Sequence, residues 1–152
     1  MRNATLPLLF LALTAFGCGL TDSKHCTLLG CQSGTRIQFS LRGAGIYVFE
    51  VTVDGAKTTC TATLPLTASP ATACPRDDVR LTLSGSSLPA DQHSLEGLEL
   101  TTTTARTITV RATRDGQLVG ESTKSPDYRT GPPPNGEGCA PDGCTSASYA
   151  FP

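Results

Sequence analysis

Seven cysteines and two histidines are the residues best suited to chemistry in this 152-residue chain. Cysteine thiolates bind metals, act as nucleophiles or form disulfides, and histidine binds metals or transfers protons. Cys18 stands apart, and the other six form three closely spaced pairs: Cys26 and Cys31, Cys60 and Cys74, and Cys139 and Cys144. An even number of cysteines in an exported chain indicates disulfides, so we expect three.

Cys18 ends an apolar leader. Arg2 gives a positive start, and residues 6–16 form an uncharged, mostly apolar run that has the length of an export-signal core and is too short to span a bilayer. Gly17 followed by Cys18 resembles a bacterial lipobox, at which signal peptidase II cleaves before a diacylated cysteine. The alternatives are a plain secretory signal that is cut elsewhere and an uncleaved anchor helix.

The lipobox-like start divides the chain into three parts. Residues 1–17 are then a removed signal peptide, residues 18–34 a lipid-anchored tether with a cysteine pair, and residues 35–152 a β-sandwich domain. Two or three acyl chains on Cys18 would hold the protein stably on a membrane leaflet. Gly19, in place of Asp, favours the outer membrane, on its periplasmic face or at the cell surface.

The composition argues against several partners. The formal net charge is −1, and no basic run exceeds two residues, whereas nucleic acids and anionic lipids require clustered Lys or Arg. Trp is absent and aromatic residues make up 5%, which weakens the case for a carbohydrate-stacking platform. We therefore expect no nucleic acid partner, and the sequence identifies no small-molecule substrate and no cofactor.

The segments that must position the cysteines alternate apolar and polar residues, with the two-residue period of β-strands. Apolar and polar residues alternate over 36–42 and 46–53, and the second run is the most apolar after the leader, so we expect it to be central. Asp54-Gly55 and Asp115-Gly116 are typical of type I′ hairpin turns. No window after Cys18 favours a helical period.

Further alternating runs follow. They are residues 59–64, with Cys60 inward, then 79–83, a weaker run at 95–100, then 106–113, 118–119 and 146–151. Pro65–Pro75 is expected to be a loop that a Cys60–Cys74 disulfide closes, and residues 131–136 are expected to run as extended polyproline. Seven or eight short strands indicate an all-β fold, an antiparallel two-sheet β-sandwich of immunoglobulin-like or prealbumin-like type, stapled by disulfides.

The pairing of the other four cysteines has two solutions. Cys26-x4-Cys31 lies before the first strand, and Cys139-x4-Cys144 repeats that spacing before the last. If these strands are parallel neighbours, as in many immunoglobulin-like sandwiches, Cys26–Cys139 and Cys31–Cys144 can form side by side. The alternative is two local loops, Cys26–Cys31 and Cys139–Cys144. Loop-closure entropy favours the long-range scheme but does not decide which forms.

Catalysis and metal binding are the weaker hypotheses. A hydrolase would depend on His93, which we expect to be a solvated loop residue, and no Gly-x-Ser-x-Gly elbow is present, so an enzyme is not expected. Zinc could be held by His25 with the cysteines at 26, 31, 139 and 144, but an oxidising compartment favours disulfides. Pro75–Asp78 could contact calcium, although a turn explains it better.

Several stretches carry a resemblance to known proteins. They are Gly45–Gly55 leading into Thr59-Cys60, then Asp127-Tyr128, and Pro134–Cys139 followed by Cys144. With the lipobox-like start and the early cysteine pair, they resemble lipoproteins that are abundant in myxobacteria, over most of the chain. The resemblance implies a surface or periplasmic β-sandwich lipoprotein and carries no activity with it. Residues 45–55 are also similar, at the level of fold alone, to prealbumin-like and carboxypeptidase-regulatory-like modules.

These observations predict a lipid-anchored protein of the bacterial cell envelope with a structural or protein-binding role. An envelope protein would be its partner, bound by loops at one end or by an exposed sheet edge.

Overall fold

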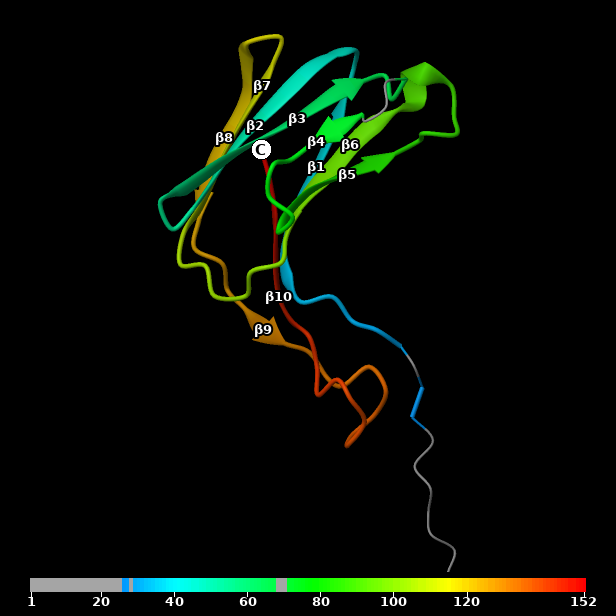
Figure 1. Ribbon diagram of the computed structural model, residues 1–152, viewed down its shortest axis with the longest axis vertical. Coiled ribbons are helices and arrows are strands. Elements are labelled where there is room, and N and C mark those ends of the chain that lie inside the picture. Colours follow the sequence, from blue (N-terminus) through cyan, green and yellow to red (C-terminus); the bar gives the residue numbers. More distant parts are fainter. Residues whose placement is uncertain (1–25, 28, 68–70) are drawn as a thin grey trace, which may run out of the picture.

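The computed structural model describes residues 26–27, 29–67 and 71–152. The expected signal peptide, Cys18 and His25 lie outside these residues. Within the described part the chain forms two five-stranded sheets that pack face to face (Figure 1). In these residues eight strands have six or more residues, and the one 3-10 turn is η1 (Ala90–Gln92). The predicted all-β sandwich is confirmed.

The first sheet, sheet A, has the strand order β5-β6-β1-β10-β9. Its strands are β5 (Val79–Ser84), β6 (Ser94–Leu100), β1 (Gly34–Arg42), β10 (Thr145–Ala150) and β9 (Arg129–Thr130). Neighbouring strands are antiparallel except β1 and β10, which are parallel with Gly34 opposite Ser146 and Gln38 opposite Ala150. The first and last strands are therefore neighbours that start at the same end of the sandwich.

The second sheet, sheet B, is antiparallel and has the order β4-β3-β2-β7-β8. Its strands are β4 (Thr72–Ala73), β3 (Ala56–Leu64), β2 (Gly45–Val53), β7 (Ile108–Arg114) and β8 (Gln117–Lys124). β2 occupies the middle, as its apolar sequence predicts. Both Asp-Gly turns adopt the predicted positive φ angles, 48° and 89° at Asp54-Gly55 and 50° and 80° at Asp115-Gly116.

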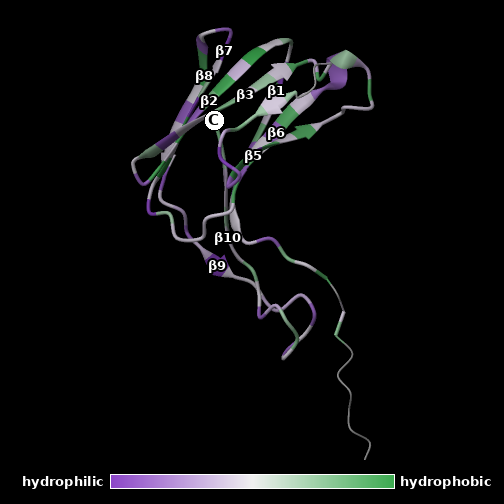
Figure 2. Ribbon diagram, in the orientation of Figure 1, coloured by the Kyte–Doolittle hydropathy of each residue, from purple (hydrophilic) through white to green (hydrophobic). Residues whose placement is uncertain are grey.

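The core lies between the sheets and is made by alternate residues of each strand, a pattern visible as bands of colour in Figure 2. Phe49 of β2 is fully buried and stacks on Phe39 of β1, with ring centroids 5.2 Å apart. Phe151, just after β10, meets Phe39 edge-on at 5.9 Å. The aromatic cluster thus joins both sheets and packs the end of the chain into the core.

Two segments differ from expectation. The loop 65–75 contains the short strand β4, which pairs with Thr61 and Ala62 of β3. Residues 131–136 do not stay extended as polyproline, because the chain turns: the Gly136 N–H donates to the Pro133 carbonyl (3.2 Å), and the Cys139 N–H donates to the Gly136 carbonyl (3.1 Å). Glycines at 136 and 138, both with positive φ, make these reversals easy.

A stalk projects from the sandwich at the end where β1 and β10 begin (Figure 1). We define it as residues 26–27, 29–33 and 131–144; in Figure 1 it comprises the blue segment before β1 and the orange loop after β9. No helix among the described residues is long and apolar enough to cross a membrane.

Candidate functional site

The parallel pairing of β1 and β10 brings the two outer cysteine pairs together in the stalk. Cys26 is bonded to Cys139 and Cys31 to Cys144, each across a sequence separation of 113, with Cα atoms 5.7 and 5.8 Å apart. These distances are typical of disulfides. The structure therefore has the long-range pairing, and the two local loops do not form.

Asn135 links the same two segments through its side-chain amide. Its Oδ1 accepts hydrogen bonds from the Thr27 hydroxyl (2.6 Å) and the Leu29 N–H (2.9 Å). Its Nδ2 donates to the carbonyls of Leu29 (3.0 Å) and Ala140 (2.7 Å). One carboxamide thus uses all four of its hydrogen-bonding positions. This explains the Pro-Asn-Gly stretch structurally, a role that the sequence alone did not assign.

The third disulfide, Cys60–Cys74, lies in the sandwich. It joins the buried sulfur of β3 to the residue that follows β4, with Cα atoms 4.3 Å apart. The bond holds the two-residue strand β4 against the edge of β3 and closes the 65–75 loop, as predicted.

Metal ligation finds little support in the arrangement of these groups. The sulfurs of Cys26, Cys31, Cys139 and Cys144 are in disulfides, and zinc is bound by cysteine as thiolate. Across residues 26–27, 29–67 and 71–152, no three or more His, Cys, Asp or Glu side chains are grouped to hold a metal.

The acidic turn before β5 forms an ion pair. The Arg76 guanidinium donates to both carboxylate oxygens of Asp78, at 2.8 and 2.5 Å. This hydrogen bonding lowers the pKa of Asp78. The Arg76 guanidinium thus stabilises the turn at Pro75–Asp78, which the sequence favours over a calcium site.

His93 is buried, with 6% of its surface exposed, so the expectation of a solvated loop histidine is wrong. Its Nδ1 accepts a hydrogen bond from the Leu66 N–H (2.9 Å), and its Nε2 donates to the Leu88 carbonyl (2.9 Å). The imidazole ring therefore connects the start of the 65–75 loop to the loop before β6. The polar residues beside His93 in the sequence suggest exposure. The sequence does not reveal the contact that buries the ring, because Leu66, whose N–H donates to it, is 27 residues away.

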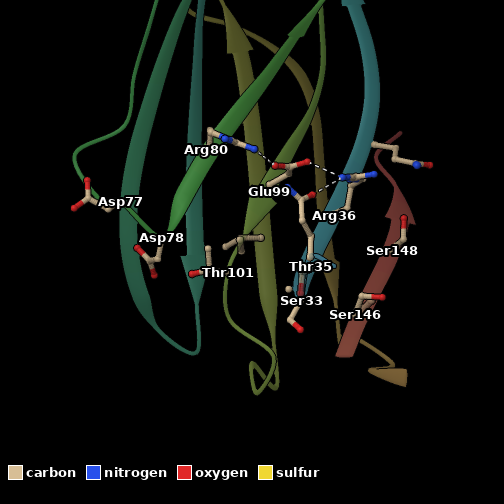
Figure 3. A pocket seen from close by; sticks show the side chains of 15 residues that line it. Ser33, Thr35, Arg36, Asp77, Asp78, Arg80, Glu99, Thr101, Ser146 and Ser148 are labelled. Carbon is tan, nitrogen blue, oxygen red and sulfur yellow. Dashed lines mark hydrogen bonds and ion pairs between the residues drawn. The ribbon is translucent and has the colours of Figure 1, made fainter. Parts of the chain in front are cut away.

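A groove of about 630 Å³ crosses the outer face of sheet A (Figure 3). Arg80, Glu99, Arg36 and Ser148 occupy matching register positions on β5, β6, β1 and β10, so they form a row across the strands. Gly34 lies beside this row, where a Cβ would come within 2.2 Å of the Leu100 carbonyl oxygen. The glycine is therefore required by the close approach of the Leu100 backbone.

Glu99 fixes the two guanidinium groups of this row. Its carboxylate oxygens accept from Arg36 at 2.8 Å and from Arg80 at 2.6 Å, as the dashed lines of Figure 3 mark. The Arg80 hydrogen bond is the main reason why the pKa of Glu99 is lowered. The arginine side chains remain 53% and 69% exposed, so most of their N–H donors face solvent.

The groove is polar and mixed in charge. Asp77 and Asp78 line one end, and Ser146 and Ser148 line the other (Figure 3). Fixed guanidinium groups and free hydroxyls suit hydrogen bonding to the polar surface of another polypeptide. The sequence did not single out these residues, because only the strand register places them in one row.

A smaller hollow of about 500 Å³ lies between β10 and the segment that follows β8. Tyr149 lines it, and its buried hydroxyl has no hydrogen-bond partner among the described residues. Burial raises the pKa of Tyr149 to about 12. The phenol is therefore neutral at physiological pH and is poorly suited to act as a base.

Comparison with known proteins adds no assignment: no protein-family model, no curated protein and no solved structure matches the chain.

Proposed function

We propose that this protein is a lipid-anchored β-sandwich of the bacterial cell envelope that has a structural or protein-binding role. The observation that carries the proposal is the double disulfide of the stalk, which ties the segment after the expected anchor to the last strand. Stable disulfides favour an oxidising compartment. The lipobox-like Gly17-Cys18 supplies the expected attachment point, a few residues before Cys26.

The stalk fits the role of a spacer between membrane and sandwich. A chain anchored at Cys18 would enter the sandwich through Cys26 and Cys31, both bonded to the segment before β10. The Gly43-Ala44 and Asp115-Gly116 turns lie at the opposite end from the start of β1. The lateral groove on sheet A would be accessible to a neighbouring envelope protein.

Mass spectrometry of protein purified without reductant from its own membranes tests the anchor. We expect a mature N-terminus at Cys18 with added acyl mass and six other cysteines without free thiols. A Cys18→Ser variant should leave the membrane fraction, whereas a Ser23→Ala control should remain in it. An unmodified N-terminus at another residue would contradict the lipid anchor.

Site-specific photocrosslinking in cells tests the binding role. A photoreactive residue at Ser148 should give an adduct with an envelope protein, and Arg36→Gln with Arg80→Gln should weaken that adduct. The same probe at Thr59, on the exposed outer face of sheet B, is the control. Equal adducts at both positions, or an adduct insensitive to the arginines, would contradict binding through the groove.

A further inference from the structure

The Asn135-Gly136 step of the stalk combines an electrophile and an unhindered nucleophile. The side-chain Cγ of an asparagine can be attacked by the backbone nitrogen of the next residue, and a glycine there offers the least steric hindrance. Nothing lies within 4 Å of the position that a Cβ would occupy at Gly136, so this turn is open to solvent. Asn135-Gly136 is therefore a step of the stalk at which the side-chain amide is prone to deamidation.

In the closed stalk, both reacting groups are hydrogen-bonded to other partners. The Gly136 N–H donates to the Pro133 carbonyl at 3.2 Å. The Asn135 carboxamide is directed elsewhere, to Thr27, Leu29 and Ala140, by four hydrogen bonds of 2.6 to 3.0 Å. Cyclisation requires the side chain to leave these partners and the turn to change shape. The disulfides on either side hold the partners in place.

We infer that Asn135 is a deamidation site that the closed stalk protects and that opening of the stalk exposes. The inference does not depend on the lipid anchor or on a partner, because it rests on contacts within the described chain.

The reaction needs only water. The Gly136 nitrogen forms a bond to Asn135 Cγ, and the Cγ–Nδ2 bond breaks. Nδ2 leaves as ammonia with the proton from the Gly136 N–H, and a succinimide remains. Water then opens either carbonyl–nitrogen bond of the ring, giving aspartate or isoaspartate at position 135. No oxidant or reductant takes part in these steps.

The product cannot restore the original contacts. A carboxylate accepts hydrogen bonds but does not donate them. In the intact protein Asn135 Nδ2 donates to the carbonyl oxygens of Leu29 and Ala140, at 3.0 and 2.7 Å. After deamidation to aspartate, a negatively charged oxygen would take the place of this donor and repel both carbonyl oxygens. Deamidation would therefore loosen the contact between the two segments of the stalk. If the stalk stays open long enough for Asn135 to react, it cannot close again with its original hydrogen bonds.

The first test measures deamidation of the whole purified protein at mildly alkaline pH, by the mass increase of the peptide that contains Asn135. We expect at least about a tenfold faster reaction after the disulfides are reduced and alkylated, because several hydrogen bonds and two cross-links restrain the side chain. Equal rates in both forms, or no reaction in the reduced chain, would overturn the inference.

A disulfide-intact variant separates the stalk from global unfolding. Thr27→Val removes the hydroxyl that donates to Asn135 Oδ1, and it should accelerate deamidation several-fold. Thr59→Val, an exposed threonine of the sandwich, is the matched control and should not. If both variants behave like the wild type, the carboxamide contacts do not protect the site.

The Asn135→Asp variant tests whether the aspartate product of deamidation loosens the stalk. Its two stalk disulfides should be reduced by a thiol several-fold faster than in the wild type, while Cys60–Cys74 reacts at its original rate. Unchanged reduction of Cys26–Cys139 and Cys31–Cys144 would show that the carboxylate does not loosen the stalk.

Discussion

The sandwich and the stalk are stabilised in different ways. The sandwich buries a continuous set of aliphatic and aromatic side chains between two sheets, including Phe39, Phe49 and Phe151. The stalk contributes one strongly buried residue, Cys139, and leaves Leu29 60% exposed. Two disulfides and one asparagine side chain hold its segments together.

The difference follows from how much apolar surface each region can bury. A segment with few apolar side chains cannot offset the entropy lost on ordering its backbone, so cross-links must replace a core. Among the described residues no disulfide joins one sheet to the other, and Cys60–Cys74 fastens an edge loop. The comparison predicts that removing the stalk disulfides loosens the stalk and frees the unfolded chain, whereas apolar truncation removes packing inside the sandwich.

Removing both stalk disulfides should have the largest effect. By the chain-entropy model, replacing one pair with serines costs about 2–3 kcal/mol, because the remaining bond still closes the long loop. Replacing both pairs costs roughly 7 kcal/mol, more than the sum of the single losses. Urea denaturation of the two single-pair variants and the double variant measures this. A double loss equal to the sum would mean that the bonds act independently.

Phe49→Ala should destabilise the sandwich by about 3–5 kcal/mol. The ring is fully buried and stacks on Phe39, so its loss leaves a cavity between the sheets. Urea denaturation gives the free energy of unfolding, and thiol titration should find the stalk disulfides intact. A loss below about 1 kcal/mol would contradict a core that depends on this contact.

His93→Ala tests a polar contact inside the sandwich. The Leu66 N–H and the Leu88 carbonyl would lose their partner, at a cost of about 1–3 kcal/mol. Hydrogen exchange should accelerate at Leu66, and the exposed residue Asp91, changed to Ala, serves as the control. Unchanged exchange at Leu66 would argue against the imidazole as its acceptor.

Glu99→Gln should give the smallest effect, and one that depends on pH. The pKa of Glu99 is lowered in the folded protein, so its ion pairs stabilise the fold above about pH 4.5, the usual value. This contribution is lost as pH falls through the lowered pKa. Urea denaturation of the two proteins should differ at neutral pH and converge in acid. A constant difference would show that ionisation of Glu99 is not responsible.

Local features of the fold could be predicted from the sequence, because their causes lie within a few residues. The Asp-Gly turns follow from tolerance of positive φ, and the central place of β2 follows from its apolar alternation. The cysteine pairing remained open between two schemes. Only the contact between β1 and β10, at opposite ends of the chain, decides it.

The residues that sequence analysis missed all depend on distant partners. Asn135 contacts Leu29 across 106 residues, and Arg36 contacts Glu99 across 63. His93 was assigned to solvent because its sequence neighbours are polar, although it binds a backbone N–H of another loop. A period or a turn motif describes only local preference. Strand register sets the Arg36–Glu99 pair, and the packing of loops that are distant in the sequence sets the contacts of Asn135 and His93.

The position of Cys31–Cys144 has a mechanical consequence. Cys31 precedes β1, and Cys144 directly precedes β10, so the elements from β1 to β9 lie inside the ring that this bond closes. Tension applied between the N-terminal segment and Pro152 would pass through the sulfur atoms into β10 and bypass the rest of the sandwich. The covalent path therefore carries this tension in place of the contacts among the strands from β1 to β9. Those strands would bear only a force that is applied directly to the loops between them.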